Sequence, residues 1–68
     1  MVTYEQLLNE LKKEMGPIAK IFLERAMNSL GITEINKENY KDVLEVLKMN
    51  SSIRDYISEV ERRLEKIS

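Results

Sequence analysis

The chain has 68 residues, and it contains neither cysteine nor histidine. A chain of this length forms one domain, residues 1–68, and buries only about 60% of the surface that it exposes when unfolded. Disulfides cannot stabilise it, and catalytic triads or metal sites that need histidine or cysteine cannot be built. Eleven basic and twelve acidic side chains give a net charge of −1, so the chain lacks the overall basic field of a nucleic-acid-binding module.

The longest apolar run covers only residues 21–23, which is far too short to span a membrane. The N-terminus has no basic region followed by an apolar stretch, so the sequence predicts no secretory signal. We therefore expect no membrane partner and a cytoplasmic location.

The first predicted helix covers residues 4–15. Thr3 is the expected N-cap, and Gln6 stands at the position that completes a capping box. Val2 can pack on Leu7 across this first turn. The apolar residues at helical spacing then form one stripe, made of Leu7, Leu8, Leu11 and Met15.

The second predicted helix covers residues 17–30 and is the most apolar part of the chain. Pro17 suits the first turn of a helix, so Gly16 and Pro17 predict a sharp corner after the first helix. The apolar side chains spread over roughly two thirds of the helix circumference, whereas a helix packed on one neighbour needs about one third. They are Ile18, Ala19, Ile21, Phe22, Leu23, Ala26, Met27 and Leu30. We therefore expect this helix to be central or to contact a partner.

Three small residues are predicted to have structural roles in and after this helix. Ala19 and Ala26 lie seven residues apart in the middle of the apolar arc, where another helix could approach closely. Gly31 can adopt the left-handed conformation that ends a helix, with Ile32 packing back on Met27. Together with Gly16 and Pro17, these residues define the helix ends and its close contacts.

Two further helices complete the predicted fold. The third covers residues 37–49 with Asn36 as its N-cap, and the fourth covers residues 53–67 with Ser51 or Ser52 as its cap. The fourth carries an apolar seam of Ile53, Ile57, Val60, Leu64 and Ile67. The short connections predict an all-α, compact, antiparallel bundle of four short helices, covering about 4–15, 17–30, 37–49 and 53–67.

Paired carboxylates are the nearest approach to a catalytic or metal-binding pattern. Glu10 with Glu14, and Glu61 with Glu65, share a helix face at the i,i+4 spacing. Because lysines and arginines surround them, a solvent-facing surface of ion pairs is the favoured interpretation. No glycine-rich phosphate loop is present either. We expect no enzymatic activity, no cofactor and no bound metal.

A nucleic-acid-binding regulator is the alternative class. Residues 30–33 resemble the turn of a helix-turn-helix, and the fourth helix has a basic edge of Arg54, Arg62, Arg63 and Lys66. The helix after the turn, however, carries several acidic side chains, which phosphates would repel. Nucleic acid is therefore the less favoured partner.

Arg25 lies inside the apolar arc of the second helix, between Ile21 and Phe22 on the helical wheel. Its stem can cover apolar surface while the guanidinium reaches water, or it can anchor an interface, where arginine is enriched. A small-ligand pocket beside Arg25 that takes an anionic metabolite is a third option. The second apolar edge of the helix favours core packing, but it also suits an adaptable contact surface. The candidate partner-binding residues are Arg25, Leu23, Met27, Leu30 and Phe22.

The stretch from Glu14 to Ala19, followed by residues 23–26, resembles a small helical domain of uncharacterised function that is appended to bacterial signalling proteins, including kinases and response regulators. The hallmark of that domain is a Gly-Pro-Ile-Ala turn followed by a helix with an Arg-Ala core. The matching positions are Gly16, Pro17, Ile18, Ala19, Arg25 and Ala26. The resemblance implies an accessory, protein-binding module.

These observations predict a non-enzymatic helical interaction module, with a signalling or regulatory accessory role. It would self-associate as a homo-oligomer or dock on a partner protein through the second helix.

Overall fold

The computed structural model describes residues 2–67, with the backbone alone for Ile67. Its elements are α1 (Tyr4–Met15), the 3₁₀ turn η1 (Gly16–Ile18), α2 (Ala19–Leu30), α3 (Tyr40–Lys48) and α4 (Arg54–Ile67). No strand occurs within this range, so the all-α prediction is confirmed. The two ends of the predicted domain, Met1 and Ser68, lie outside the described residues.

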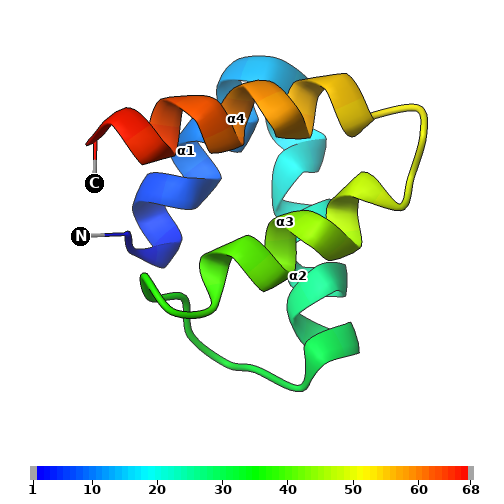
Figure 1. Ribbon diagram of the computed structural model, residues 1–68. Coiled ribbons are helices and arrows are strands. Elements are labelled where there is room, and N and C mark those ends of the chain that lie inside the picture. The colour runs from blue at the N-terminus through cyan, green and yellow to red at the C-terminus, as the bar shows by residue number, and fades with distance from the viewer. Residues whose placement is uncertain (1, 68) are drawn as a thin grey trace.

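The helices are arranged in a ring around one core (Figure 1). Each of α1, α2 and α3 packs against the next helix in the chain, and α4 returns to pack against α1. Because α1, η1 and α2 follow one another without a gap, residues 4–30 form one continuous helical path that bends at η1. The described chain therefore has three helical stretches, where the sequence predicts four separate helices.

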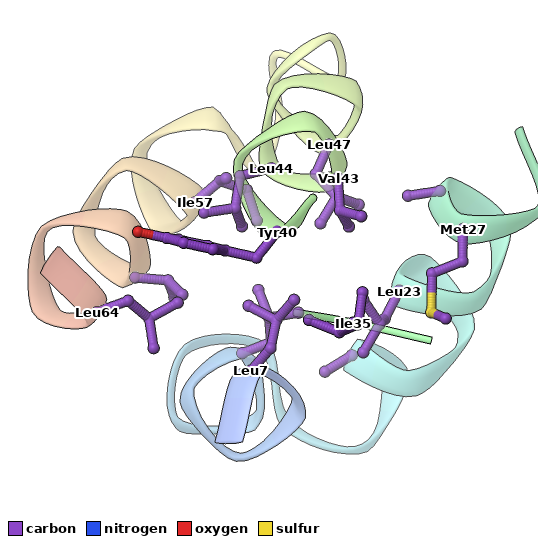
Figure 2. Close-up of a cluster of buried hydrophobic side chains, with 14 of the residues drawn as sticks. Leu7, Leu23, Met27, Ile35, Tyr40, Val43, Leu44, Leu47, Ile57 and Leu64 are labelled. Carbon is purple, nitrogen blue, oxygen red and sulfur yellow. The ribbon is translucent and has the colours of Figure 1, made fainter. Parts of the chain in front are cut away.

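Figure 2 shows the core side chains converging from all four helices. Leu7 comes from α1, Leu23 from α2, Val43 and Leu44 from α3, and Leu64 from α4; each of these five side chains is fully buried. Val2, which precedes α1, and Ile35, which lies in the connection between α2 and α3, also contribute. Among the residues whose side chains are described, the buried apolar ones are Val2, Leu7, Leu11, Ala19, Leu23, Ala26, Met27, Ile35, Tyr40, Val43, Leu44, Leu47, Ile53, Ile57, Val60 and Leu64.

Thr3 caps the N-terminus of α1, as predicted. Its hydroxyl oxygen accepts a hydrogen bond from the Gln6 N–H at 3.2 Å. The reciprocal bond of a capping box is absent, because Gln6 Oε1 is buried and accepts no hydrogen bond from the described residues. The cap is therefore one-sided.

Both glycines have positive φ angles that explain the ends of α1 and α2. Gly16 has φ 71° and ψ −151°, a conformation essentially restricted to glycine, and its N–H donates to the Lys12 carbonyl. Pro17 follows inside η1, so α2 begins at Ala19 and not at Pro17 as predicted. Gly31 has φ 68° and ψ 29°; its N–H donates to the Asn28 carbonyl at 3.1 Å.

The Gly31 stop also includes the second bond expected of this motif. The Ile32 N–H donates to the Met27 carbonyl at 3.1 Å, which is the Schellman pattern predicted from the sequence. These two bonds satisfy carbonyls that the end of α2 would otherwise leave without a donor.

The third and fourth helices begin at Tyr40 and Arg54, three residues and one residue later than predicted, and an asparagine side chain bonds the turn in front of each. Asn36 Oδ1 accepts from the N–H groups of Glu38 (2.8 Å) and Asn39 (3.0 Å), so residues 37–39 form a turn and α3 starts at Tyr40. Asn50 Oδ1 accepts from the Ser52 N–H (3.0 Å) and hydroxyl (2.7 Å). The predicted serine cap is therefore wrong, since Ser52 donates and Asn50 accepts.

The apolar seam predicted for α4 is confirmed at Ile53, Ile57, Val60 and Leu64, which are all buried. The side chain of Ile67, its fifth predicted member, lies outside the described residues. This seam packs against α1 on one side and α3 on the other.

Candidate interaction surface on α2

The helix α2 packs mainly against α1 and α3, and this contact buries one of its faces. Ala19 and Ala26 lie on that face with 0% and 2% of their surface exposed, so both alanines stand where the chain packs tightly. Leu23 (0% exposed) and Met27 (7%) are core residues too. In this structure Leu23 offers no surface to a partner and Met27 offers very little, although the sequence makes both candidates.

The remaining candidate residues are accessible to different degrees. Leu30 is 38% exposed at the end of α2, Phe22 is half-buried against the core, and Arg25 is exposed. Arg25 forms no ion pair with another described residue and is exposed, which is compatible with both sequence interpretations.

Two isoleucines outside the candidate set are more exposed than any of its apolar members. Ile18 is 50% exposed and Ile21 is 56% exposed. With Phe22 and Arg25 they follow the i, i+3, i+4, i+7 spacing of a single helix face. We call these four residues the α2 strip. The sequence contains one indication of the α2 strip: the charged Arg25 lies on this side of the apolar arc, which indicates that this side faces water.

A shallow groove of about 150 Å³ lies beside the α2 strip, between α2 and the C-terminal part of α3. Its lining residues are Phe22, Arg25, Ala26, Ser29, Val46, Leu47, Asn50 and Ile53. The cavity that the ligand hypothesis placed beside Arg25 therefore exists. Small-molecule sites measure about 300–1,000 Å³, so this groove is the size of a side chain and smaller than such sites.

The sequence interpretation missed an ion-pair cluster that connects α1 and α4. Arg63 Nε donates to Glu10 Oε1 at 2.7 Å, and Arg63 Nη1 donates to Glu14 Oε1 at 3.1 Å. Lys13 also pairs with Glu10, at 2.8 Å. Glu10 is only 7% exposed, so the prediction that it lies on a solvent face is wrong.

The electrostatics of this cluster follow from its hydrogen bonds. Bonds from Lys13 and Arg63 lower the pKa of Glu10, because they stabilise the carboxylate more than burial destabilises it. The same geometry, with Glu10 as the main partner and Glu14 second, raises the pKa of Arg63. Residues 10, 14 and 63 flank the apolar stripes of their helices, which is the position where interhelical ion pairs form.

A second set of ion pairs connects α3 to α4. Lys48 pairs with Glu61, and the hydrogen bond that the Lys48 ammonium donates to the Glu61 carboxylate is the main cause that raises the pKa of Lys48. Lys41 Nζ lies 3.4 Å from Glu65 Oε2. For Glu61 and Glu65 the prediction of a surface of ion pairs is therefore confirmed. No group of three acidic, histidine or cysteine side chains that could hold a metal occurs in residues 2–67.

The two features behind the nucleic-acid alternative do not form the expected geometry. In the basic edge of α4, Arg62 pairs with Glu59 and Arg63 pairs with the α1 carboxylates. The helix α2 ends at residue 30 and α3 begins at residue 40, so nine residues (31–39) connect them. A helix-turn-helix uses a turn of about 3–4 residues.

Within the described part of the chain, no helix combines the length and apolar character that a membrane crossing requires.

The chain resembles a sequence and a solved structure from the same organism, and no family model matches it. It is 61% identical over 66 residues to an uncharacterised protein of Archaeoglobus fulgidus, with 97% of each chain covered. It is also similar to the crystal structure of Archaeoglobus fulgidus Af1502, with a TM-score of 0.94 and 60% identity over 96% of each chain. Neither finding links the chain to signalling proteins, so the resemblance through the Gly-Pro-Ile-Ala turn remains a prediction.

Proposed function

The chain belongs to the same family as the Archaeoglobus fulgidus protein Af1502, and from its geometry we propose that it is a non-enzymatic helical interaction module. Its α2 strip binds a second copy of the chain. The observation that carries this proposal is the pair of half-exposed isoleucines, Ile18 and Ile21, next to an apolar groove. A regulatory or signalling accessory role is what the resemblance around Gly16 implies for such a module.

The exposed isoleucines of the strip supply part of the free energy that weak association requires. Full burial of an isoleucine contributes about 1.5–3 kcal/mol, and Ile18 and Ile21 each have about half of that left to gain. The four isoleucines of a pair would together contribute roughly 3–6 kcal/mol. Association costs an estimated 4–15 kcal/mol, so the groove must contribute as well and the dissociation constant should lie in the micromolar to millimolar range.

Charge supports a second copy as the occupant. The net charge of −1 produces little repulsion between copies. Glu24 and Arg25 follow Ile21 at the i+3 and i+4 positions, so both signs of charge border this isoleucine. A two-fold pair places the same patch on both sides of the interface, and a patch with both signs can be complementary to itself.

Sedimentation equilibrium from about 10 µM to about 1 mM tests the proposal over this affinity range. We expect the wild-type mass to rise toward that of a dimer, and Ile21→Gln to remain monomeric. Met49→Gln is the matched control, because Met49 is an 80% exposed apolar side chain outside the strip. A wild-type chain that stays monomeric throughout, or an equal loss of association in both variants, would refute pairing through the α2 strip.

A further inference from the structure

A second and larger cavity, of about 370 Å³, lies between the start of α1, the C-terminal half of α2 and the segment that follows it. Its lining residues are Tyr4, Glu24, Met27, Asn28, Ile32 and Thr33. Its volume falls within the range of small-molecule sites, about 300–1,000 Å³. It shares no lining residue with the groove beside Arg25 or with the α2 strip, so it would be a separate site.

The lining combines an apolar part with a set of hydrogen-bond acceptors. Met27 is buried, and Ile32 is half-buried against the core, so these two side chains form an apolar wall. The Tyr4 hydroxyl donates to Glu24 Oε2 at 3.3 Å, which links the carboxylate to the start of α1. Asn28 and Thr33, whose side chains carry an amide and a hydroxyl group, complete the polar part of the lining.

Glu24 is the only charged residue of this lining, so the cavity has a net negative charge. Burial, the negative charge of Glu24 and the hydrogen bond to Glu24 all raise the pKa of Tyr4, so Tyr4 adds no negative charge to the cavity at neutral pH. An anionic ligand would be repelled. A divalent metal takes several carboxylate or carbonyl ligands, whereas this lining has a single carboxylate.

A primary ammonium group fits this arrangement better, because it carries one positive charge and three donors that all need acceptors. We propose that the cavity binds an alkylammonium ligand, with the ammonium at Glu24 and the oxygens of Asn28 and Thr33. Its methylene groups pack on Met27 and Ile32. The same chemistry can come from a free alkylamine or from a lysine side chain of another protein.

Amide proton–nitrogen correlation spectra at neutral pH test the proposal, with n-butylammonium as the probe. We expect saturable shifts at Asn28, Ile32 and Thr33, and none with butyrate or n-butanol at equal concentration. Glu24→Gln, which keeps the size of the side chain, should weaken binding by about tenfold or more, as the loss of one charge-assisted hydrogen bond predicts. Glu38→Gln is the matched control, because it removes the same charge outside the cavity and should bind like wild type.

Three results would overturn the proposal: no saturable shifts with butylammonium, equal shifts with butyrate or butanol, or wild-type affinity in Glu24→Gln. A second probe, Nα-acetyl-lysine N-methylamide, separates the two sources of the ligand. Tighter binding of this probe assigns the site to a protein lysine, and tighter binding of butylammonium assigns it to a free amine. The sedimentation test of the α2 strip is independent, since Ile21 is not in this cavity.

Discussion

Arg63 offers the sharpest test of what holds α4 against α1, because its guanidinium joins two carboxylates across the two helices. We consider Arg63→Met, which keeps much of the aliphatic stem and removes the charge and all donors. Arg63 is 30% exposed in its side chain, whereas Glu10 is only 9% exposed, so the carboxylate left behind cannot be fully rehydrated. The variant should therefore lose more than an ordinary surface ion pair contributes.

The expected cost follows from the contacts. A hydrogen bond to a charged group contributes about 1.5–3 kcal/mol, and Arg63 donates one to Glu10 at 2.7 Å and another to Glu14 at 3.1 Å. Removing one member of a fully buried pair costs about 3–5 kcal/mol. In the variant Lys13 still pairs with Glu10, with 2.8 Å between Nζ and Oε2, so Glu10 keeps one partner and the loss should be smaller than for a fully buried pair. We expect Arg63→Met to lower the free energy of unfolding by about 2 kcal/mol.

Thermal and urea denaturation, followed by far-ultraviolet circular dichroism at pH 7, measures this loss. A loss of about 2 kcal/mol in a domain of this size corresponds to a decrease in Tm of roughly 8–16 °C. Arg62→Met is the control, since Arg62 is 59% exposed and pairs with Glu59 on its own helix. It should leave the midpoint nearly unchanged. Equal midpoints in the two variants would refute the view that the pair of Arg63 with Glu10 stabilises the fold.

The same pair gives stability a pH dependence of known sign. Bonds from Lys13 and Arg63 lower the pKa of Glu10 in the folded state, so its contribution is fully present above the unfolded value of about 4.5. This contribution is lost as the pH falls through the lowered folded pKa. Arg63→Met removes part of this lowering of the Glu10 pKa. We therefore expect the free energy of unfolding to fall less steeply with decreasing pH in the variant than in wild type.

The two glycines and Ala26 give the remaining expectations. Gly31→Ala should lower the free energy of unfolding by about 1–2 kcal/mol, the cost of a left-handed conformation, and Gly31→Asn should recover part of it. Gly16→Ala should lower the free energy of unfolding more than Gly31→Ala does in the same urea experiment, because the Gly16 backbone, with ψ −151°, is strained for any residue other than glycine. An equal loss in the two variants would contradict this reasoning. Ala26→Leu should overpack the contact of α2 with α3 and lower the free energy of unfolding by about 1–3 kcal/mol. A denaturation midpoint equal to that of wild type would show that the groove beside Phe22 accepts the larger side chain.

The features that the sequence predicted correctly depend on residues close together in the chain. The Thr3 cap and the Gly31 stop each involve only a few residues in a row. The bonds confirm Thr3 as the N-cap and the Schellman pattern at Gly31, whereas the second bond of the predicted capping box is absent from the described residues. The start of α3 was predicted three residues too early, although Asn36 Oδ1 accepts from the N–H groups of Glu38 and Asn39, which is the bonding expected of the predicted N-cap.

The candidate surface could be predicted only in part. An apolar arc of roughly two thirds of a helix has no unique buried face, so the pattern could not decide which side α1 and α3 cover. They cover Leu23 and Met27 and leave Ile18 and Ile21 exposed. The pair of Glu10 with Arg63 was missed for a similar reason, since 53 residues separate its members and no local pattern connects them.

The ring arrangement of the helices also has a consequence for the rate of folding. Packing between successive helices closes short loops, so most of the structure can form quickly, as in other helical domains of low contact order. Only the contact of α4 with α1 closes a loop of nearly the whole chain, which carries the largest entropic cost. We expect this contact to form after the transition state, so Arg63→Met should accelerate unfolding and leave the folding rate almost unchanged. Stopped-flow measurements in urea would separate the two rates, and a folding rate slowed in proportion to the lost stability would place α4 in the nucleus.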